Sequence, residues 1–229
     1  MKSLDGVRAC VFDAYGTLFD FASAVARCAE VPDDKRAALT ALWRDKQLQY
    51  SWLRSLQGRY ADFRQVTEDA LNFALNRLDI ANLGLRGRLM DLYETLQAFP
   101  EVPDTLRQLR SAGFVTAILS NGTPSMLDAA VRASGLQGLF DAVLSADAVQ
   151  VFKTDPRVYE YGLRQLGLKA EQVCFQSSNG WDAYGASAFG MRVVWCNRYD
   201  QRPEWLPGEP DHVIRTLAEL PPLLLARNG

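Results

Sequence analysis

Four short apolar runs without polar alternation place the strongest constraint on how this chain folds. A strand that shows no alternation is buried on both faces, as strands inside a parallel sheet are. Stretches with helical spacing separate the later runs, and a glycine follows each stretch, as is common where helices end. The runs lie at residues 7–12, 115–119, 173–175 and 191–195, and the helical stretches at 104–112, 123–134, 156–166 and 181–189. This order predicts an α/β fold, a doubly wound, Rossmann-like parallel sheet.

Residues 21–98 interrupt this order, because they have the spacing of one helix after another. The segment predicts a helical cap domain inserted into a discontinuous core made of residues 1–20 and 99–229. Because the insertion follows the first strand directly, we expect it to lie over the carboxyl ends of the strands and to exclude water there. Its apolar stripe at helical spacing consists of Leu39, Trp43, Tyr50, Leu53 and Leu56.

The balance of charge argues against two classes of partner. The 229 residues include 25 Lys and Arg and 27 Asp and Glu, which gives a formal net charge of −2, and no basic run is present. The long-range field that attracts nucleic acid or an anionic membrane is therefore missing, and we expect neither as a partner. The first apolar run ends at Asp13, too early for a signal peptide or a membrane span, so we expect a cytoplasmic protein.

Cysteine and histidine chemistry has little support in the sequence. The cysteines, Cys10, Cys28, Cys174 and Cys196, include no CxxC pair, which is poor spacing for a zinc site and sparse for a disulfide framework. We expect them to be reduced thiols in the core. The single histidine, His212, follows the last predicted strand, and no GxSxG motif accompanies it, so we expect an ordinary surface residue.

A lone carboxylate, Asp13, stands where the first strand breaks into a glycine turn, in the sequence VFDAYGTL at residues 11–18. Enzymes with α/β folds hold their reactive groups at this end of the strands. Tyr15 occupies the position where a second carboxylate would supply a proton, which favours a leaving group that needs none. Later strand ends carry Ser120-Asn121-Gly122, Lys153 and the run SSNGWD at 177–182, and we expect all of them to converge on one crevice.

The order of Asp13, Ser120, Lys153 and Asp182 resembles the haloacid dehalogenase superfamily, whose cap the helical insertion also resembles. Phosphatases of that superfamily usually carry DxD at the first motif, where the second Asp protonates a departing alcohol, and Tyr15 departs from that pattern. Three motifs resemble the L-2-haloacid dehalogenase branch instead. They are D-x-Y-G-T-L at residues 13–18, Trp-Arg at 43–44 and S-S-N-x-W-D at 177–182.

This resemblance implies hydrolytic dehalogenation of (S)-2-haloalkanoic acids to (R)-2-hydroxyalkanoic acids and halide. Asp13 would displace halide from the carbon next to the substrate carboxyl group, with inversion, and water would then hydrolyse the aspartyl ester. Halide leaves as a stable anion, so Arg44, with a fixed charge and several donors, would suffice to receive it. Asp182 would orient or activate the water, since this step needs a base and no histidine lies in the motifs.

Further residue roles come from the same resemblance, in which Lys153 neutralises Asp13 while Thr17 and Tyr159 hold the network in register. The implied catalytic residues are Asp13, Thr17, Arg44, Ser120, Lys153, Tyr159, Ser177, Asn179 and Asp182. The implied substrate-binding residues are Ala14, Tyr15, Arg44, Leu48, Phe63, Ser120, Asn121, Ser178 and Trp181. Simpler interpretations stand beside these roles, because Ser and Asn often cap helices or form turns and leucine and aromatic side chains are usually core.

Two other functions stay open on the residues alone. One is a Mg²⁺-dependent phosphatase acting on a small phosphomonoester, and the other is a non-catalytic protein on the same scaffold. The leading hypothesis needs no metal or cofactor, because a monoanionic haloacid needs no bridging cation. The resemblance also implies a homodimer formed through the cap helices. Asp45 stands where the branch usually has glutamine, so it could pair with Arg44 or change the range of substrates.

Overall fold

The computed structural model describes residues 3–80 and 84–225, and the core of these residues is one six-stranded sheet in which all neighbouring strands are parallel. Its order is β3-β2-β1-β4-β5-β6, so the chain runs outward from β1 on one side and from β4 on the other. The strands are β1 (Ala9–Phe12), β2 (Val115–Ser120), β3 (Ala142–Ser145), β4 (Val173–Ser177), β5 (Arg192–Cys196) and β6 (His212–Ile214). The predicted doubly wound fold is confirmed, and the two directions meet between β1 and β4, the place where folds of this kind bind their ligands.

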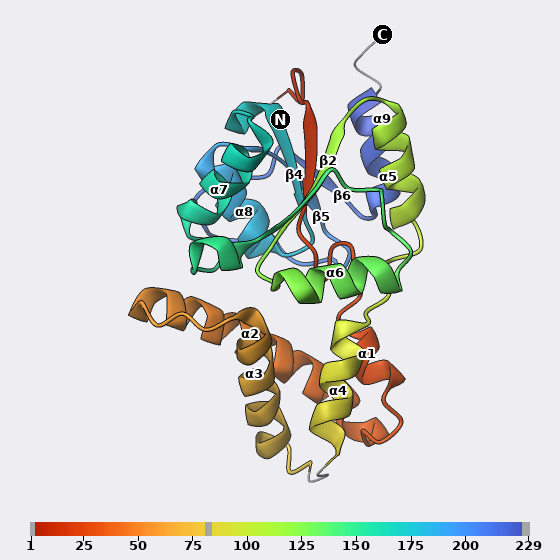
Figure 1. Cartoon of the computed structure of the whole chain (residues 1–229), viewed down its shortest axis with the longest axis vertical. Helices are drawn as coiled ribbons and strands as arrows, with labels where there is room; N and C mark the ends of the chain where they lie inside the picture. The colour runs from red at the N-terminus through yellow and green to blue at the C-terminus, as the bar shows by residue number, and fades with distance from the viewer. Residues whose placement is uncertain (1–2, 81–83, 226–229) are drawn as a thin grey trace.

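Helices cover both faces of the sheet (Figure 1). Successive strand residues point to opposite faces, so Phe12 packs in a cluster with α5, α6 and α9, and Val11 packs in a second cluster with α7 and α8. These core helices are α5 (Val102–Ser111), α6 (Pro124–Ala133), α7 (Pro156–Leu166), α8 (Gly180–Phe189) and α9 (Leu220–Leu225). Short 3₁₀ turns also occur, at η1 (Asp33–Lys35), η2 (Ala146–Val149), η3 (Ala170–Gln172) and η4 (Leu217–Glu219).

The helical insertion forms a separate layer beyond one end of the sheet (Figure 1), which confirms the predicted cap. Its helices are α1 (Ser23–Arg27), α2 (Arg36–Gln57), α3 (Phe63–Arg77) and α4 (Leu85–Glu94). Helix α2 ends at Gly58, whose φ of 63° lies in the left-handed region that glycine tolerates. Asp62 then caps α3 by accepting a hydrogen bond from the Gln65 N–H, so α2 and α3 form a hairpin.

The apolar stripe of α2 is buried only at its beginning. Leu39 and Trp43 are buried and Tyr50 is half-buried, but Leu53 and Leu56 are 44 % and 84 % exposed. The last turns of α2 therefore extend past the side chains that cover its first turns. Helical spacing identifies a common face, but it does not show how far the neighbouring elements reach along that face.

Two edge strands, β3 and β6, were not predicted. His212 opens β6 and is half-buried, so the expectation of a surface residue after the last strand is wrong. The cysteine prediction is confirmed, because all four are buried free thiols. Burial raises the pKa of Cys174 to about 12 and that of Cys196 to about 11, which keeps both thiols protonated at neutral pH. Within the two described ranges, no helix combines the length and apolar character needed to cross a membrane.

Candidate active site

Asp13 follows β1 directly and lies in the crevice between β1 and β4. Its backbone N–H donates to the Gln176 carbonyl at 2.8 Å, and the residue is only 6 % exposed. Three donors hold its carboxylate: Oδ1 accepts from Lys153 Nζ at 3.2 Å, and Oδ2 accepts from Thr17 Oγ1 at 3.1 Å and from Asn179 Nδ2 at 2.8 Å. These donors fix the carboxylate in one orientation.

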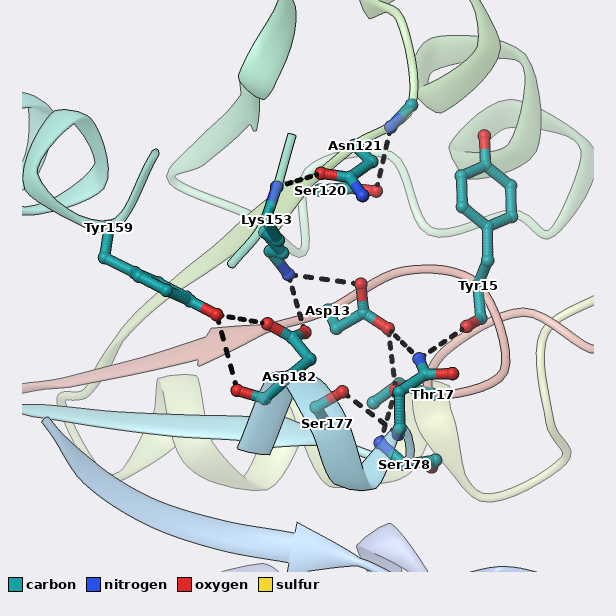
Figure 2. A network of polar contacts seen from close by, with 12 residues as sticks. Asp13, Tyr15, Thr17, Ser120, Asn121, Lys153, Tyr159, Ser177, Ser178 and Asp182 are labelled. Atoms are coloured by element: carbon teal, nitrogen blue, oxygen red, sulfur yellow. Dashed lines mark hydrogen bonds and ion pairs between the residues drawn. The ribbon is translucent and has the colours of Figure 1, made fainter. Parts of the chain in front are cut away.

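Lys153 lies between two carboxylates (Figure 2). Its fully buried Nζ also donates to Oδ2 of the equally buried Asp182 at 2.8 Å. Burial raises the pKa of Asp182, Lys153 opposes this shift, and the charge of Asp13 adds to it. Tyr159 donates its hydroxyl to Asp182 Oδ1 at 2.8 Å, and burial together with the Asp182 charge raises the pKa of Tyr159 well above its ordinary value. The phenol therefore remains a hydrogen-bond donor.

Asn179 connects the carboxylate to the cap. It holds the N-cap position of α8, yet its side chain makes no capping bond. Instead Nδ2 donates to Asp13 Oδ2 and to the Tyr15 carbonyl at 3.1 Å, while Oδ1 accepts from Arg44 Nη2 at 3.1 Å. Helix capping therefore does not account for this asparagine.

Ser177 and Ser178, which precede Asn179, each make one hydrogen bond that involves a backbone N–H. Ser177 Oγ accepts from the Asn179 N–H at 3.1 Å, and the Ser178 N–H donates to Thr17 Oγ1 at 2.7 Å. Because the Thr17 hydroxyl in turn donates to Asp13, it links the loops that follow β1 and β4.

The loop after β2 brings two more predicted residues to the crevice. Thr123 caps helix α6, so Ser120 and Asn121 are not its capping residues. Asn121 Oδ1 accepts from the Lys153 N–H at 2.9 Å and so positions the lysine. Ser120 Oγ accepts from the Gly122 N–H at 3.2 Å, the turn contact that was the simpler interpretation of this serine.

Arg44 reaches the site from cap helix α2. Its Nη1 donates to Gln47 Oε1 at 2.7 Å, its Nη2 donates to Asn179, and its guanidinium lies 5.1 Å from the centre of the Phe21 ring. Asp45 is exposed, and Arg44 makes these contacts instead of pairing with it. The side chain is therefore aimed into the site rather than into solvent.

Tyr15 offers no acid to the reaction centre. Its phenol stacks on Tyr93 at 5.3 Å and packs against Phe63 at 5.8 Å, directed away from Asp13 (Figure 2). Among the described residues, its buried hydroxyl has no hydrogen-bond partner. Burial raises the pKa of Tyr15 well above its ordinary value, with further contributions from the charges of Tyr93 and Asp13.

The other predicted pocket residues are spread over different surroundings. Ala14 is fully buried beside Asp13, and Leu48 is half-buried on α2. Trp181 is half-buried and packs edge-on against Trp52, with ring centres 5.5 Å apart.

Sequence reasoning missed two polar residues that support the site. Gln47 is 1 % exposed and, besides accepting from Arg44, donates to Thr67 Oγ1 at 2.6 Å. Nothing in the sequence marks it except its place one turn after Arg44. Arg198 donates to the Thr17 carbonyl at 2.9 Å and pairs with Glu101 at 2.6 Å. It follows β5, so the strand-end rule that selected Asp13 could have selected it too.

Within the part of the chain that the structure describes, no group of three or more His, Cys, Asp or Glu side chains is arranged to hold a metal ion. The two carboxylates of the crevice share the Lys153 ammonium as their counter-charge.

The fold and the site define an α/β enzyme whose reactive groups lie at the carboxyl ends of parallel strands beneath a helical cap. Comparisons with known proteins agree with this class. The family model for haloacid dehalogenase-like hydrolases matches residues 7–190.

Two kinds of relative were found. (S)-2-haloacid dehalogenase 4A of Burkholderia cepacia is 47 % identical over 222 residues, which is 96 % of each chain. A crystal structure of a dehalogenase superposes with a TM-score of 0.94 at 48 % identity, covering 96 % of this chain and 98 % of that one. The structure of L-2-haloacid dehalogenase from Xanthobacter autotrophicus with covalently bound chloropropionic acid has a TM-score of 0.90 at 37 % identity, covering 96 % and 99 %. The chain belongs to the haloacid dehalogenase-like hydrolases.

Proposed function

We propose that this hydrolase converts (S)-2-haloalkanoic acids to (R)-2-hydroxyalkanoic acids and halide. The observation that carries the proposal is the side chain of Asn179, which donates to Asp13 and accepts from Arg44. It joins a carboxylate nucleophile to a cation suited to a departing anion. The names of the relatives, and the covalently bound chloropropionic acid in one of them, support the same reaction.

In the first step, an Asp13 oxygen attacks C2 of the substrate from the face opposite the halogen. The C–O bond of an aspartyl ester forms while the carbon–halogen bond breaks, the halide leaves with the electron pair, and the configuration at C2 inverts. Arg44 and Asn179 receive the halide. No proton is transferred, which agrees with the Tyr15 hydroxyl being directed away from Asp13.

In the second step, water attacks the carboxyl carbon of the esterified Asp13. Asp182, the second carboxylate that Lys153 Nζ contacts, accepts a proton of the water. The bond between the Asp13 carboxyl carbon and the oxygen on C2 then breaks, and the hydroxyacid leaves with that former Asp13 oxygen and takes the proton from Asp182. The Asp13 carboxyl group keeps the oxygen of the water and releases the remaining proton to solvent. Ser177 and Ser178 orient the loop around this water, while Tyr159 positions Asp182.

The substrate is bound by two further groups of residues in this proposal. Ser120 and Asn121, with the backbone N–H groups of Ala14 and Tyr15, bind its carboxylate at the ends of β2 and β1. Leu48, Phe63 and Trp181 contact the substituent on C2. Lys153 offsets the charge of both carboxylates, and Thr17 keeps Asp13 in register. No cofactor or metal takes part in these steps.

We also propose that residues 21–98 act as one cap and that two copies of the chain associate through it. Support comes from the apolar side chains that α2 and α3 expose, with Leu53 44 %, Leu56 84 % and Phe73 37 % exposed. An apolar patch of this kind is typical of an interface. Sedimentation of Leu56→Glu against the unaltered protein tests the dimer, which we expect to dissociate.

The reaction is tested by halide release from each enantiomer of 2-chloropropionate with EDTA present. We expect chloride from the S enantiomer alone, (R)-lactate as its product, and no chloride from Asp13→Asn. Asp34→Asn, which changes an exposed aspartate, is the matched control and keeps full activity. In a single turnover in oxygen-18 water, we expect the label in Asp13 rather than in lactate. Metal-dependent release of phosphate from phosphomonoesters, without halide release, would establish the phosphatase instead, and turnover of neither class would indicate a non-catalytic protein.

A further inference from the structure

An apolar groove lies between the cap and the core, with Trp181 in its wall. Cap helix α2 contributes Trp52, the core helices contribute Trp181 and Ala188, and the loop after β5 contributes Leu206. The cavity has a volume of about 590 Å³, within the range of small-molecule sites, and aromatic and apolar side chains form most of its walls.

The groove adjoins the reacting groups through shared residues. Tyr159 forms part of its wall and donates its hydroxyl to Asp182 at 2.8 Å. Trp181, on another wall, directly precedes Asp182 at the beginning of α8 and packs edge-on against Trp52. A molecule in the groove therefore lies one side chain away from the carboxylate proposed to activate water.

One face of α2 runs from the site to the groove. Arg44, Leu48 and Trp52 are four residues apart, so they lie on the same face at successive turns. The rise of a helix places the first and the last about 12 Å apart. This face begins with a guanidinium bonded to Asn179, continues with an apolar side chain and ends in the aromatic wall of the groove. It matches a ligand with an anionic leaving group at one end and a hydrocarbon chain at the other.

We propose that the groove binds the hydrocarbon chain of larger (S)-2-haloacids, which makes straight-chain acids such as (S)-2-bromooctanoate substrates of this enzyme. The inference rests on the proposed function and extends it past Leu48, Phe63 and Trp181, which contact the substituent of a short substrate. Trp52 and Leu206 are the residues that set the accepted chain length. Both are partly exposed, at 36 % and 47 %, so a bound chain also removes their apolar surface from water.

The test compares kcat/KM for bromide release from (S)-2-bromooctanoate and (S)-2-bromopropionate. Trp52→Ala removes one wall, and we expect a loss of about 10-fold or more with the long substrate, the lower end of the effect of one missing methylene contact in an apolar pocket. With the short substrate we expect less than a twofold change. Trp205→Ala is the matched control, because Trp205 lies on the same loop as Leu206 but does not line the groove, and its side chain is fully exposed to solvent. It should leave both values unchanged.

A second variant works in the opposite direction. Ala188→Phe fills the groove at an exposed position, so it should exclude the long substrate and spare the short one even where Trp52→Ala disturbs the cap. Equal losses for both substrates in both variants, or no bromide from 2-bromooctanoate with the unaltered enzyme, would overturn this inference and leave the proposed function intact. Halide release from no haloacid at all would refute the proposed function itself.

Discussion

Replacing Lys153 with methionine removes the one positive charge that Asp13 and Asp182 share. Lys153 and Asp182 have no exposed side-chain surface, and the Asp13 side chain is 8 % exposed. Water therefore has little access to compensate for the missing ammonium. We expect a folded but strongly destabilised protein with no haloacid turnover.

The size of this loss follows from the two ion-pair distances. With an effective dielectric constant of about 20, attractions across 2.8 and 3.2 Å amount to about 6 and 5 kcal/mol. Removing the ammonium from water offsets several kcal/mol of this sum. Removing one partner of a buried ion pair typically destabilises a protein by about 3–5 kcal/mol. We expect the free energy of unfolding to fall by that amount at neutral pH.

The loss depends on pH in a definite direction. Burial already raises the pKa of Asp182 and Lys153 opposes the shift, so removing Lys153 raises that pKa further. A carboxyl group with a raised pKa binds its proton more tightly in the folded state. The loss of stability caused by the raised pKa of Asp182 is therefore absent below the unfolded pKa of about 4, and it grows as pH rises through the folded pKa. Lys153→Met should therefore lose less stability at pH 5 than at pH 8.

Urea unfolding at pH 5 and pH 8, with reductant present, measures these differences. The expected loss at pH 8 lowers the midpoint by about 1–2 M urea, given slopes near the upper end of the usual range. Lys169→Met, the same change at an exposed lysine, should stay within about 0.5 kcal/mol of the unaltered protein. An equal loss at both pH values, or a loss below about 1 kcal/mol, would refute the account of a shared buried counter-charge.

Three further substitutions test single contacts. Arg44→Lys cannot keep the forked contacts of a guanidinium, and we expect kcat for halide release to fall about 10²–10³-fold with the melting temperature unchanged. Tyr159→Phe removes a hydrogen bond that lowers the pKa of Asp182, so the acidic limb of the kcat–pH profile should move to higher pH. Gly122→Ala would place its Cβ 2.8 Å from the Tyr15 ring, and urea unfolding should show a loss of about 1–3 kcal/mol.

Each of these changes has a matched control. Arg164→Lys alters an exposed arginine of α7 and should keep full activity. Tyr161→Phe removes the hydroxyl of a half-buried tyrosine on the same helix and should leave the pH profile in place. The Cβ of Gly87→Ala, in the first turn of α4, would meet nothing within 4 Å, so this change should stabilise the protein by about 0.5–1 kcal/mol. If a control changes its readout as much as its partner, the specific contact is not the cause.

The central strands could be predicted because each is buried on both faces. β1 and β4 consist entirely of buried residues and β5 almost entirely, so each of these strands contains a short apolar run without polar alternation. β3 and β6 lie at the two edges of the sheet, are three or four residues long and are partly exposed. Their sequences therefore lack a long apolar run, and these strands can be identified only from their pairing with β2 and β5 in the structure.

The crevice residues could be expected together because a parallel sheet gathers its strand ends at one edge. From the sequence alone, this rule predicts that Asp13, Asn121 and Asn179 lie near one another. It could not predict the role of Gln47, because nothing in a helix sequence shows which polar side chain will bind a partly buried arginine such as Arg44. Nor could it show that Trp181 packs on Trp52, since that contact depends on how the cap docks on the core.

The charges around Lys153 give the proposed reaction an order in time. In the free enzyme one ammonium faces two carboxylates, and burial raises the pKa of Asp182, Lys153 lowers it and Asp13 raises it again. Ester formation neutralises Asp13 and so removes the negative charge that raises the pKa of Asp182, while the attraction of the ammonium remains, and that pKa therefore drops. The base is thus most fully ionised once there is an ester for water to attack. The consumption of Asp13 in the first step thus prepares Asp182 for the second step, which regenerates Asp13.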